Sequence, residues 1–237
     1  TMRDLEHRNI VRYCTAWVEK PPPGWQMRSD ARMLDRLPPN NRSIPIDHNY
    51  HCNLLYILMP VYSRSLEDWL SENPQQPRDT QIIKSLFKQM LEAVAYLHDK
   101  GHIHRDIKPS NILMDGDNGI RLCDFGTASQ FETHEGQEIS QTRTQKVGTP
   151  LYTSPEKDYW RYTSKVDVFA LGLIYVEMNV RMTADVRSKA FDNYRRGIAN
   201  DNIEIVNART RELITGMTKV NSDERHSCRD ILDSYFR

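Results

Sequence analysis

Cysteine is scarce in this 237-residue sequence, and the four cysteines are scattered. Cys14, Cys52, Cys123 and Cys228 form no Cys-x-x-Cys pair, a spacing that argues against a zinc site and against a disulfide framework. Unpaired cysteines persist in reducing compartments. We therefore expect a cytoplasmic protein.

An excess of charge of either sign and long hydrophobic runs are also absent. Lys plus Arg and Asp plus Glu number 32 each, so no global field favours nucleic acid or anionic lipid. The longest uncharged apolar run, 168–176, is too short to cross a bilayer, and no signal-peptide pattern opens the chain. We expect no direct nucleic-acid binding and no membrane contact from this segment.

A glycine-rich loop is missing as well. The ten glycines never form a Gly-x-Gly-x-x-Gly run, a pattern that covers the phosphates of a nucleotide.

Composition is otherwise ordinary for a globular protein, with 38% hydrophobic and 27% charged residues. Thr1 and Met2 fall in what reads as the end of a helix, so we expect a piece of a longer chain.

Two polar motifs lie close together in the middle of the chain. Residues 104–111 read His-Arg-Asp-Ile-Lys-Pro-Ser-Asn and, after a short hairpin, residues 124–126 read Asp-Phe-Gly. Phosphoryl transfer from ATP requires an acceptor hydroxyl aimed at the terminal phosphate and metal ions that hold the phosphates. The order and spacing of the motifs predict this chemistry, whereas aspartates that only cap turns would require neither.

Four side chains in these motifs can carry out the reaction. Asp106 can accept the proton of the substrate hydroxyl, and Lys108 can neutralise charge on the phosphoryl group in transfer. Asn111 and Asp124 supply the oxygen ligands that Mg²⁺ prefers. The sequence therefore predicts ATP and Mg²⁺ as cofactors.

The two motifs resemble the signature of protein kinases, and a lysine two places after Asp106 is typical of the serine/threonine class. The resemblance implies an α+β, bilobal protein-kinase fold with a truncated, β-rich N-lobe and a complete, mainly helical C-lobe. The implied boundaries are 1–62 for the N-lobe and 63–237 for the C-lobe, with the catalytic loop at 104–111 and the activation segment at 124–156.

The resemblance also locates the nucleotide pocket. Residues 53–59 form a compact apolar run, which we expect to be a buried strand. The alternative to a hinge after it is a plain strand end, because hinges have little sequence signature. The resemblance places the gatekeeper, the three hinge residues and the floor of the adenine pocket at Met59, Pro60, Val61, Tyr62 and Leu113.

The segment before this strand shows no periodicity, whereas a segment after it has the periodicity of a helix. Residues 19–51 contain six prolines and show no sustained periodicity, which predicts a mobile insert. Asp79 or Thr80 can cap a helix whose apolar residues recur at helical spacing as far as Gly101, a typical C-terminal cap.

Residues 127–147 are polar, as expected of an activation loop. Thr144 and Thr142 are the candidate regulatory phosphorylation sites, with Thr144 favoured. Because Arg105 precedes the catalytic aspartate, its guanidinium could pair with a phosphate on the loop. The alternative is that both threonines are solvated loop residues.

The sequence Gly-Thr-Pro-Leu-Tyr at 148–152, followed by Ser-Pro-Glu, resembles the substrate-facing platform of these kinases. Thr149 could hydrogen-bond the catalytic aspartate and lysine, and Glu156 would pair with Arg225 in a buried structural ion pair. Asp167 is the charged exception in an apolar stretch that predicts a helix buried all round, and we expect it to accept hydrogen bonds from the catalytic-loop backbone. The resemblance gives structural roles also to His104, Phe125 and Gly126.

Three features resemble one kinase family in particular, the translation initiation factor 2 alpha-subunit kinases. They are Ala-Trp-Val-Glu at 16–19 followed by prolines and Trp25, an insert between the fourth and fifth strands, and the sequence of residues 165–174. The resemblance implies phosphorylation of a serine on the alpha subunit of that factor, which represses translation under stress. It also implies substrate docking near Thr183 and Asp185. The alternative is that these two residues only cap the start of a helix. A homodimer through the N-lobe of the full-length protein is a further implication.

Two functions of different classes follow. The first is a serine/threonine kinase that acts on the initiation factor, with this chain as most of its catalytic domain. The second is a catalytically inactive, kinase-like docking module. Protein kinases also carry a lysine on a strand that follows the glycine-rich loop, and this sequence contains neither feature. Their absence favours the second function, whereas the intact Asp106, Asn111 and Asp124 favour the first.

Overall fold

The computed structural model forms two compact units, one of residues 13–60 and the other of residues 1–12 together with 61–237. We refer to them as the strand unit and the helical unit. The division falls within the predicted hinge, whereas residues 1–12 group with the helical unit. The residues that the structure describes are 5–21, 25, 53–72, 78–116, 118–134, 137–140, 150–158, 163–200, 203, 205 and 207–237.

The strand unit contains an antiparallel pair, β1 (Thr15–Glu19) and β2 (Leu54–Leu58). Trp17 lies opposite Tyr56, and their rings stack with centroids 5.3 Å apart. The strand predicted before the hinge is confirmed, but its predicted burial is wrong, because Leu55 is 64% exposed. In the described part of this unit, a two-stranded sheet has no second layer to cover its faces. Nearly all of the predicted insert lies outside the described residues.

The described N-terminal residues pack on the helical unit. Ile10 and Val11 are buried, and the Val11 amide donates a hydrogen bond to the Leu122 carbonyl at 2.9 Å. The Asn9 side-chain amide donates to the Ile120 carbonyl at 3.1 Å. These contacts explain why this segment groups with the helical unit.

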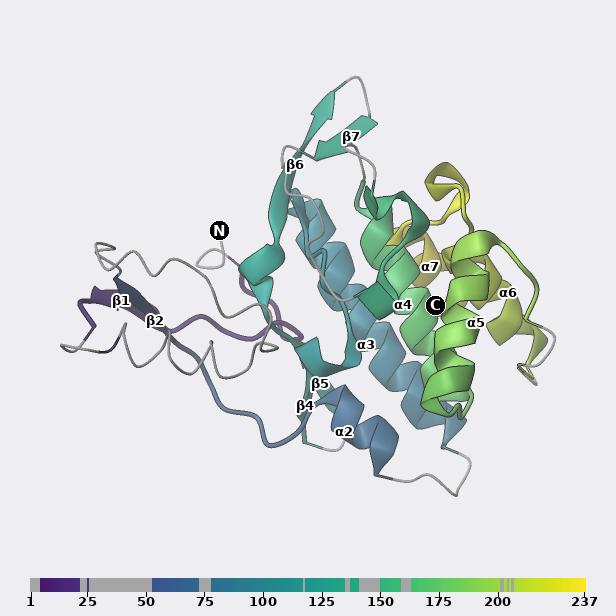
Figure 1. Cartoon of the computed structure of the whole chain (residues 1–237), viewed down its shortest axis with the longest axis horizontal. Helices are drawn as coiled ribbons and strands as arrows, with labels where there is room; N and C mark the ends of the chain where they lie inside the picture. The colour runs from purple at the N-terminus through teal and green to yellow at the C-terminus, as the bar shows by residue number, and fades with distance from the viewer. Residues whose placement is uncertain are drawn as a thin grey trace, which may run out of the picture. The chain divides into compact units, whose positions relative to one another are not determined.

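Two long helices form the core of the helical unit, α3 (Thr80–Asp99) and α4 (Lys165–Asn179), as Figure 1 shows. The Asp79 carboxylate caps α3 by accepting a hydrogen bond from the Gln81 amide at 2.7 Å. Gly101 follows the helix with φ of 73°, a left-handed conformation that glycine adopts without steric cost. Both predicted ends of this helix are confirmed.

The helix α4 is buried on every side from Val166 to Met178, as predicted from its apolar composition. Gly172 permits the close approach of the chain that follows α6 (Ala208–Met217). A Cβ atom at residue 172 would lie 2.8 Å from Thr218 Cγ2. The absence of a side chain at this position therefore allows the two segments to pack.

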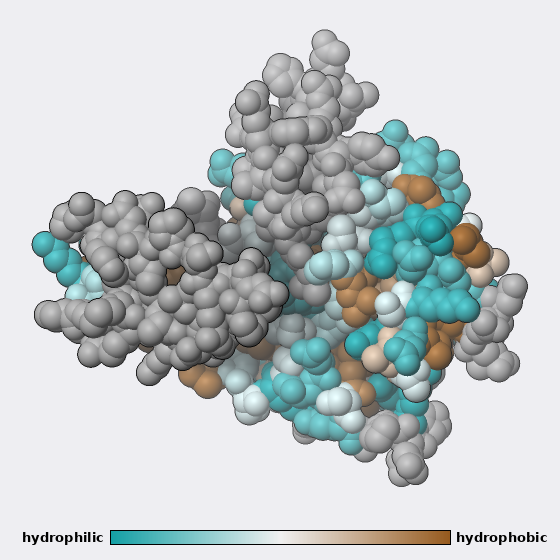
Figure 2. All heavy atoms as spheres, in the orientation of Figure 1, coloured by the Kyte–Doolittle hydropathy of each residue, from teal (hydrophilic) through white to brown (hydrophobic). Residues whose placement is uncertain are grey.

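Shorter helices surround this core. α7 (Cys228–Tyr235) packs on α3, and α6 packs on α4. On the face shown in Figure 2, hydrophobic residues form small separate patches among hydrophilic ones over the helical unit. Among the described residues, the remaining helices are α2 (Leu66–Ser71) and α5 (Ala184–Arg196), with 3-10 turns η5 (Pro150–Tyr152), η6 (Pro155–Asp158) and η7 (Ser222–Glu224).

A β-hairpin brings the two polar motifs together. β4 (Ile112–Asp115) pairs with β5 (Gly119–Leu122) in antiparallel fashion. The turn η3 (Pro109–Asn111) precedes the hairpin and η4 (Phe125–Thr127) follows it, so both motifs lie at its open end.

A three-stranded sheet completes the described strands, with the order β3-β6-β7. The mixture of dominant helices with short antiparallel strands confirms the predicted α+β class. No helix among the described residues is both long and apolar enough to span a membrane. The three strands are β3 (His102–Ile103), β6 (Ser129–His134) and β7 (Gln137–Ser140).

Candidate active site

The catalytic loop is attached to the core through one buried carboxylate. Asp167, which lies in the first turn of α4, is 1% exposed. Its Oδ2 accepts a hydrogen bond from the His104 amide at 2.8 Å, and its Oδ1 accepts one from the Arg105 amide at 2.9 Å. His98 Nε2 on α3 lies 2.9 Å from the same carboxylate. The two core helices therefore fix the backbone from which the catalytic residues project.

Two non-glycine residues in the motifs have a left-handed backbone, Arg105 with φ of 69° and Asp124 with φ of 62°. This conformation costs about 1 kcal/mol or more in such residues and is concentrated at functional sites. Arg105 Nε donates a hydrogen bond to the Thr127 carbonyl, and Asp124 Oδ1 accepts one from the Gly126 amide at 3.3 Å. These bonds help to hold both residues in strained conformations.

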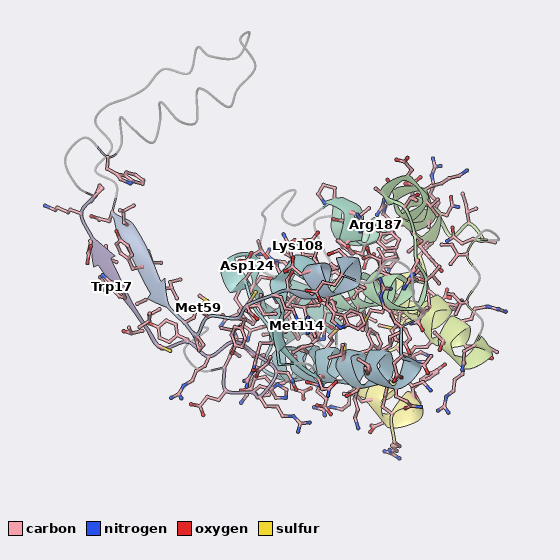
Figure 3. The ribbon with its side chains drawn as sticks, turned by 90° about the horizontal axis from the view of Figure 1, so that it is seen from below. Trp17, Met59, Lys108, Met114, Asp124 and Arg187 are labelled. Carbon is pink, nitrogen blue, oxygen red and sulfur yellow. The ribbon has the colours of Figure 1, made fainter. Side chains whose placement is uncertain are left out.

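Three of the predicted catalytic and metal-binding residues are in direct contact. Asp106 is 8% exposed, and Lys108 Nζ lies 2.8 Å from its Oδ2. Asn111 Nδ2 donates to the Asp106 carbonyl at 2.8 Å and to Asp106 Oδ2 at 3.2 Å. Figure 3 shows Lys108 and Asp124 on the same side of the helical unit. A carboxylate positioned in this way can accept a proton from a hydroxyl group placed beside it.

The buried ring of His104 joins the two motifs. Its Nδ1 accepts a hydrogen bond from the Asp106 amide at 3.3 Å, and its Nε2 lies 2.9 Å from the Cys123 carbonyl. These partners require a neutral ring with the proton on Nε2. Burial lowers the pKa of His104, although the nearby Asp167 carboxylate opposes this effect. Phe125 packs against the ring with centroids 5.0 Å apart, next to Gly126.

The side chains of Asn111 and Asp124 fit a metal ion that is held partly by a nucleotide. Because Asn111 Nδ2 bonds to Asp106, the amide oxygen of Asn111 is the atom available for a cation. Asp124 is exposed and supplies a carboxylate. No group of three or more His, Cys, Asp or Glu among the described residues could hold a metal alone. An amide oxygen and one carboxylate suit Mg²⁺, which usually keeps phosphates and waters as its other ligands.

The predicted adenine pocket draws on both units. Met59 and Pro60 belong to the strand unit, whereas Val61, Tyr62 and Leu113 belong to the helical unit. Leu113 lies on β4 opposite Arg121 and is partly exposed. The assignment of these residues to one nucleotide pocket therefore stays a prediction.

The platform residues are linked to the core by a buried ion pair. Arg225 is 2% exposed, and its two terminal nitrogens lie 2.5 and 2.9 Å from the two oxygens of the Glu156 carboxylate. Its guanidinium also donates to the Lys219 carbonyl at 2.6 Å and lies 4.9 Å from the centre of the Phe169 ring. The predicted pair thus has further partners that satisfy its remaining donors. Thr142, Thr144 and Thr149 lie outside the described residues.

The family model of the protein kinase domain matches residues 1–236. The chain belongs to the protein kinase family.

Relatives of this kinase include proteins named as kinases of translation initiation factor 2-alpha. It is 31% identical over 98% of its length to the interferon-induced, double-stranded RNA-activated protein kinase of Rattus norvegicus, of which it covers 42%. It is 30% identical over 78% of its length to the eukaryotic translation initiation factor 2-alpha kinase pek-1 of Caenorhabditis elegans, of which it covers 18%. It is 36% identical over 58% of its length to the eIF-2-alpha kinase GCN2 of Mus musculus, of which it covers 9%. The chain thus spans less than half the length of these relatives.

The helix predicted from sequence to dock the substrate is α5. Thr183 Oγ1 accepts a hydrogen bond from the Val186 amide at 3.4 Å and so caps the helix. Asp185 lies in its first turn and is exposed, where a negative charge is favourable next to the helix N-terminus. Both residues therefore have a local role in helix formation, and their assignment to substrate docking stays a prediction.

One polar cluster in this kinase was missed by sequence reasoning. The Tyr152 hydroxyl donates to Glu177 Oε2 at 2.7 Å, and the Arg187 guanidinium lies 2.5 Å from Glu177 Oε1. Burial, together with the Glu177 carboxylate, raises the pKa of Tyr152. The cluster connects the platform with α4 and α5. The available signal was a glutamate within an apolar helix, the same signal that singled out Asp167.

Proposed function

We propose that this chain is most of the catalytic domain of a serine/threonine kinase that phosphorylates a serine on the alpha subunit of translation initiation factor 2. The proposal rests above all on the Asp106 carboxylate, which Lys108 and Asn111 contact and which lies on a loop attached to buried Asp167. Relatives named as kinases of this factor support the choice of substrate. Such phosphorylation would repress translation under stress.

The residues of the chain divide the chemistry among them. Asp106 would orient the serine hydroxyl and accept its proton, and Lys108 would neutralise charge on the transferred group. ATP with Mg²⁺ would supply the phosphoryl group, with Asn111 and Asp124 as metal ligands. The neutral His104 ring maintains the contact between the two motifs and takes no proton itself.

We also propose regulation by phosphorylation of Thr144, with Thr142 as the neighbouring candidate. Arg105 would pair with the added phosphate and so order the activation loop. Thr144→Ala is expected to lower the activity of the intact protein, and Thr142→Ala tests the second candidate in the same assay. Unchanged activity of the Thr144 variant would contradict this role.

Within the family, we propose a kinase most like PERK, the endoplasmic-reticulum kinase of this factor. Its site of action would be the cytosolic face of that membrane, reached through a segment outside this chain. A homodimer formed by the N-lobe of the full-length protein is part of the same proposal.

The deciding experiment measures ATP-dependent phosphorylation of the alpha subunit by this chain and by a longer form that includes the residues upstream of it. Asp106→Asn is made in each form as the inactive control. We expect phosphorylation by at least the longer form and none by either variant. Binding of the alpha subunit without phosphorylation by both forms would overturn the proposal and favour the docking module.

A further inference from the structure

A small cavity lies in the helical unit where the platform meets the catalytic loop and the first turns of α4. Its volume is about 10 Å³, which is enough for one water molecule. We call it the platform cavity. Each of the three segments contributes three lining residues: Arg105, Asp106 and Ile107 of the loop, Tyr152, Thr153 and Ser154 of the platform, and Val166, Asp167 and Ala170 of α4.

The Ser154 side chain brings an unpaired hydroxyl group to this cavity. Ser154 is 3% exposed, and its Oγ has no hydrogen-bond partner among the described residues. A buried hydroxyl group without a partner has lost its bonds to bulk water and has gained no bond in return. The platform cavity beside it offers room for a partner.

The Asp167 carboxylate has the capacity for one more hydrogen bond. It accepts three, from His98 Nε2 at 2.9 Å, the His104 amide at 2.8 Å and the Arg105 amide at 2.9 Å, whereas a carboxylate can accept about four. Burial raises the pKa of Asp167, but the hydrogen bonds from His98 and the His104 amide outweigh burial and hold this pKa below its ordinary value. The carboxylate is therefore charged, and a fourth partner must be a donor.

One water molecule satisfies both groups. It can accept the proton of the Ser154 hydroxyl and donate one of its own to the Asp167 carboxylate, and a buried water needs about two to four such partners. The other two lining residues of α4, Val166 and Ala170, have apolar side chains and offer no competing bond. The two partners therefore come from different segments, the platform and α4.

Such a water reaches the group that holds the catalytic loop. The same carboxylate accepts hydrogen bonds from the His104 and Arg105 amides, which directly precede Asp106. A change in the position of the carboxylate therefore moves the loop, and misplacement of a catalytic group by about 1 Å can lower a rate by about 10²-fold. The water would link the position of the platform to that of the catalytic aspartate.

We propose that the platform cavity binds one water molecule, which bridges the Ser154 hydroxyl and the Asp167 carboxylate. Through this water, Ser154 is a positioning residue for the catalytic loop. The catalytic part of the inference rests on the proposed kinase function, whereas the water site does not depend on it.

The stability of Ser154→Ala distinguishes a hydrated cavity from a dry one. If the water is bound, the variant loses one buried hydrogen bond, and we expect the melting temperature to fall by about 2–4 °C. If the cavity is dry, the variant removes an unpaired hydroxyl group, and the melting temperature rises. Thermal unfolding of the longest form of the protein measures the shift. A rise or no change would overturn the proposal.

Ser129→Ala is the matched control for stability. Ser129 is 6% exposed, and its hydroxyl group also has no partner among the described residues, but it does not line the platform cavity. We expect no fall in the melting temperature of this variant. A fall as large as that of Ser154→Ala would show that the effect does not require the cavity, which would overturn the proposal.

The kinetics of Ser154→Ala test the positioning role. Well below the melting temperature, we expect kcat to fall about fivefold, as for the loss of one hydrogen bond, with the KM for ATP unchanged. Thr218→Val is the control, because it removes a buried hydroxyl group that donates to the Ile214 carbonyl at 2.8 Å, outside the platform cavity. We expect this variant to keep its kcat. An unchanged kcat in Ser154→Ala, or an equal fall in both variants, would overturn the positioning role.

A crystal structure separates this proposal from the kinase function. If no form of the protein phosphorylates the alpha subunit, the proposed function fails, and the electron density in the platform cavity decides the question of the water. One ordered water within about 3.0 Å of both Ser154 Oγ and an Asp167 carboxylate oxygen supports the site. A well-ordered cavity without such a water overturns it.

Discussion

The catalytic loop and the β1–β2 sheet differ in what holds them in place. In the loop, buried His104 bonds to a backbone carbonyl, buried Asp167 of α4 accepts hydrogen bonds from two loop amides, and the Asp106 carboxylate is contacted by two side chains. In the sheet, Val18 is 60% exposed and Leu55 is 64% exposed, and one ladder and one stacked ring pair hold the strands. The polar residues of the loop are thus buried, whereas the apolar residues of the sheet are exposed. In these two regions, burial therefore follows the covering layers more closely than the hydrophobicity of single residues.

The largest effect on activity is expected when the Asp106 carboxylate is replaced by an amide of the same shape. Asp106→Asn should lower kcat by about 10³-fold, because the amide cannot accept the hydroxyl proton. The melting temperature should change little, since an amide oxygen can still accept the bonds from Lys108 and Asn111. Steady-state kinetics and thermal unfolding of the active form measure the two effects. A large fall in melting temperature would show that the loop is not a preformed site.

The next effect concerns the buried ion pair of the platform. Arg225→Met should lower the free energy of unfolding by about 3–5 kcal/mol, because it leaves the Glu156 carboxylate without its partner. Arg237→Met is the control, since Arg237 is 79% exposed and its pair with Asp233 should contribute less than about 1 kcal/mol. Denaturant unfolding measures both. Equal losses would remove the distinction between buried and exposed polar contacts.

A matched pair of substitutions compares a buried leucine of α4 with an exposed leucine of β2. Leu173→Ala, at a residue with 0% exposure in α4, should lower the free energy of unfolding by about 2–5 kcal/mol. Leu55→Ala, in the exposed sheet, should lower it by less than about 0.5 kcal/mol. Denaturant unfolding of this chain provides both values. A cost at Leu55 similar to that at Leu173 would show that β2 is covered in solution.

A smaller effect is expected from the pH dependence of stability. Burial lowers the pKa of His104 from its ordinary value of 6.5, so below that pH the unfolded state binds a proton that the folded state excludes. The stabilisation is complete above about pH 6.5 and is lost as pH falls, by up to about 1.4 kcal/mol per unit.

The measurement compares unfolding free energies between pH 7 and pH 5 for the protein and for His104→Gln. His7 is replaced by Gln in both, because burial also lowers the pKa of His7. We expect a shallower dependence in the His104 variant. Parallel curves would mean that His104 titrates alike in the folded and unfolded states.

Sequence reasoning predicted the fold class and the long helices well, because their signals are local. The apolar periodicity of α3, its cap at Asp79 and its terminal Gly101 need no knowledge of the rest of the chain. Asp106 and Lys108 were also singled out, since both lie on one short loop, but their contact was not predicted. The burial of β2 could not be predicted in the same way, because it depends on a second layer.

By itself, the sequence determined the chemistry that this chain can offer, since the type, order and spacing of Asp106, Lys108, Asn111 and Asp124 are properties of the linear chain. Only the tertiary structure decided which distant groups meet. Glu177 bonds to Tyr152, 25 residues away, and to Arg187, 10 residues away, and their contact joins η5 to α4 and α5. The physical reason is that a polar group acts through its partners, and folding chooses those partners by packing rather than by sequence distance.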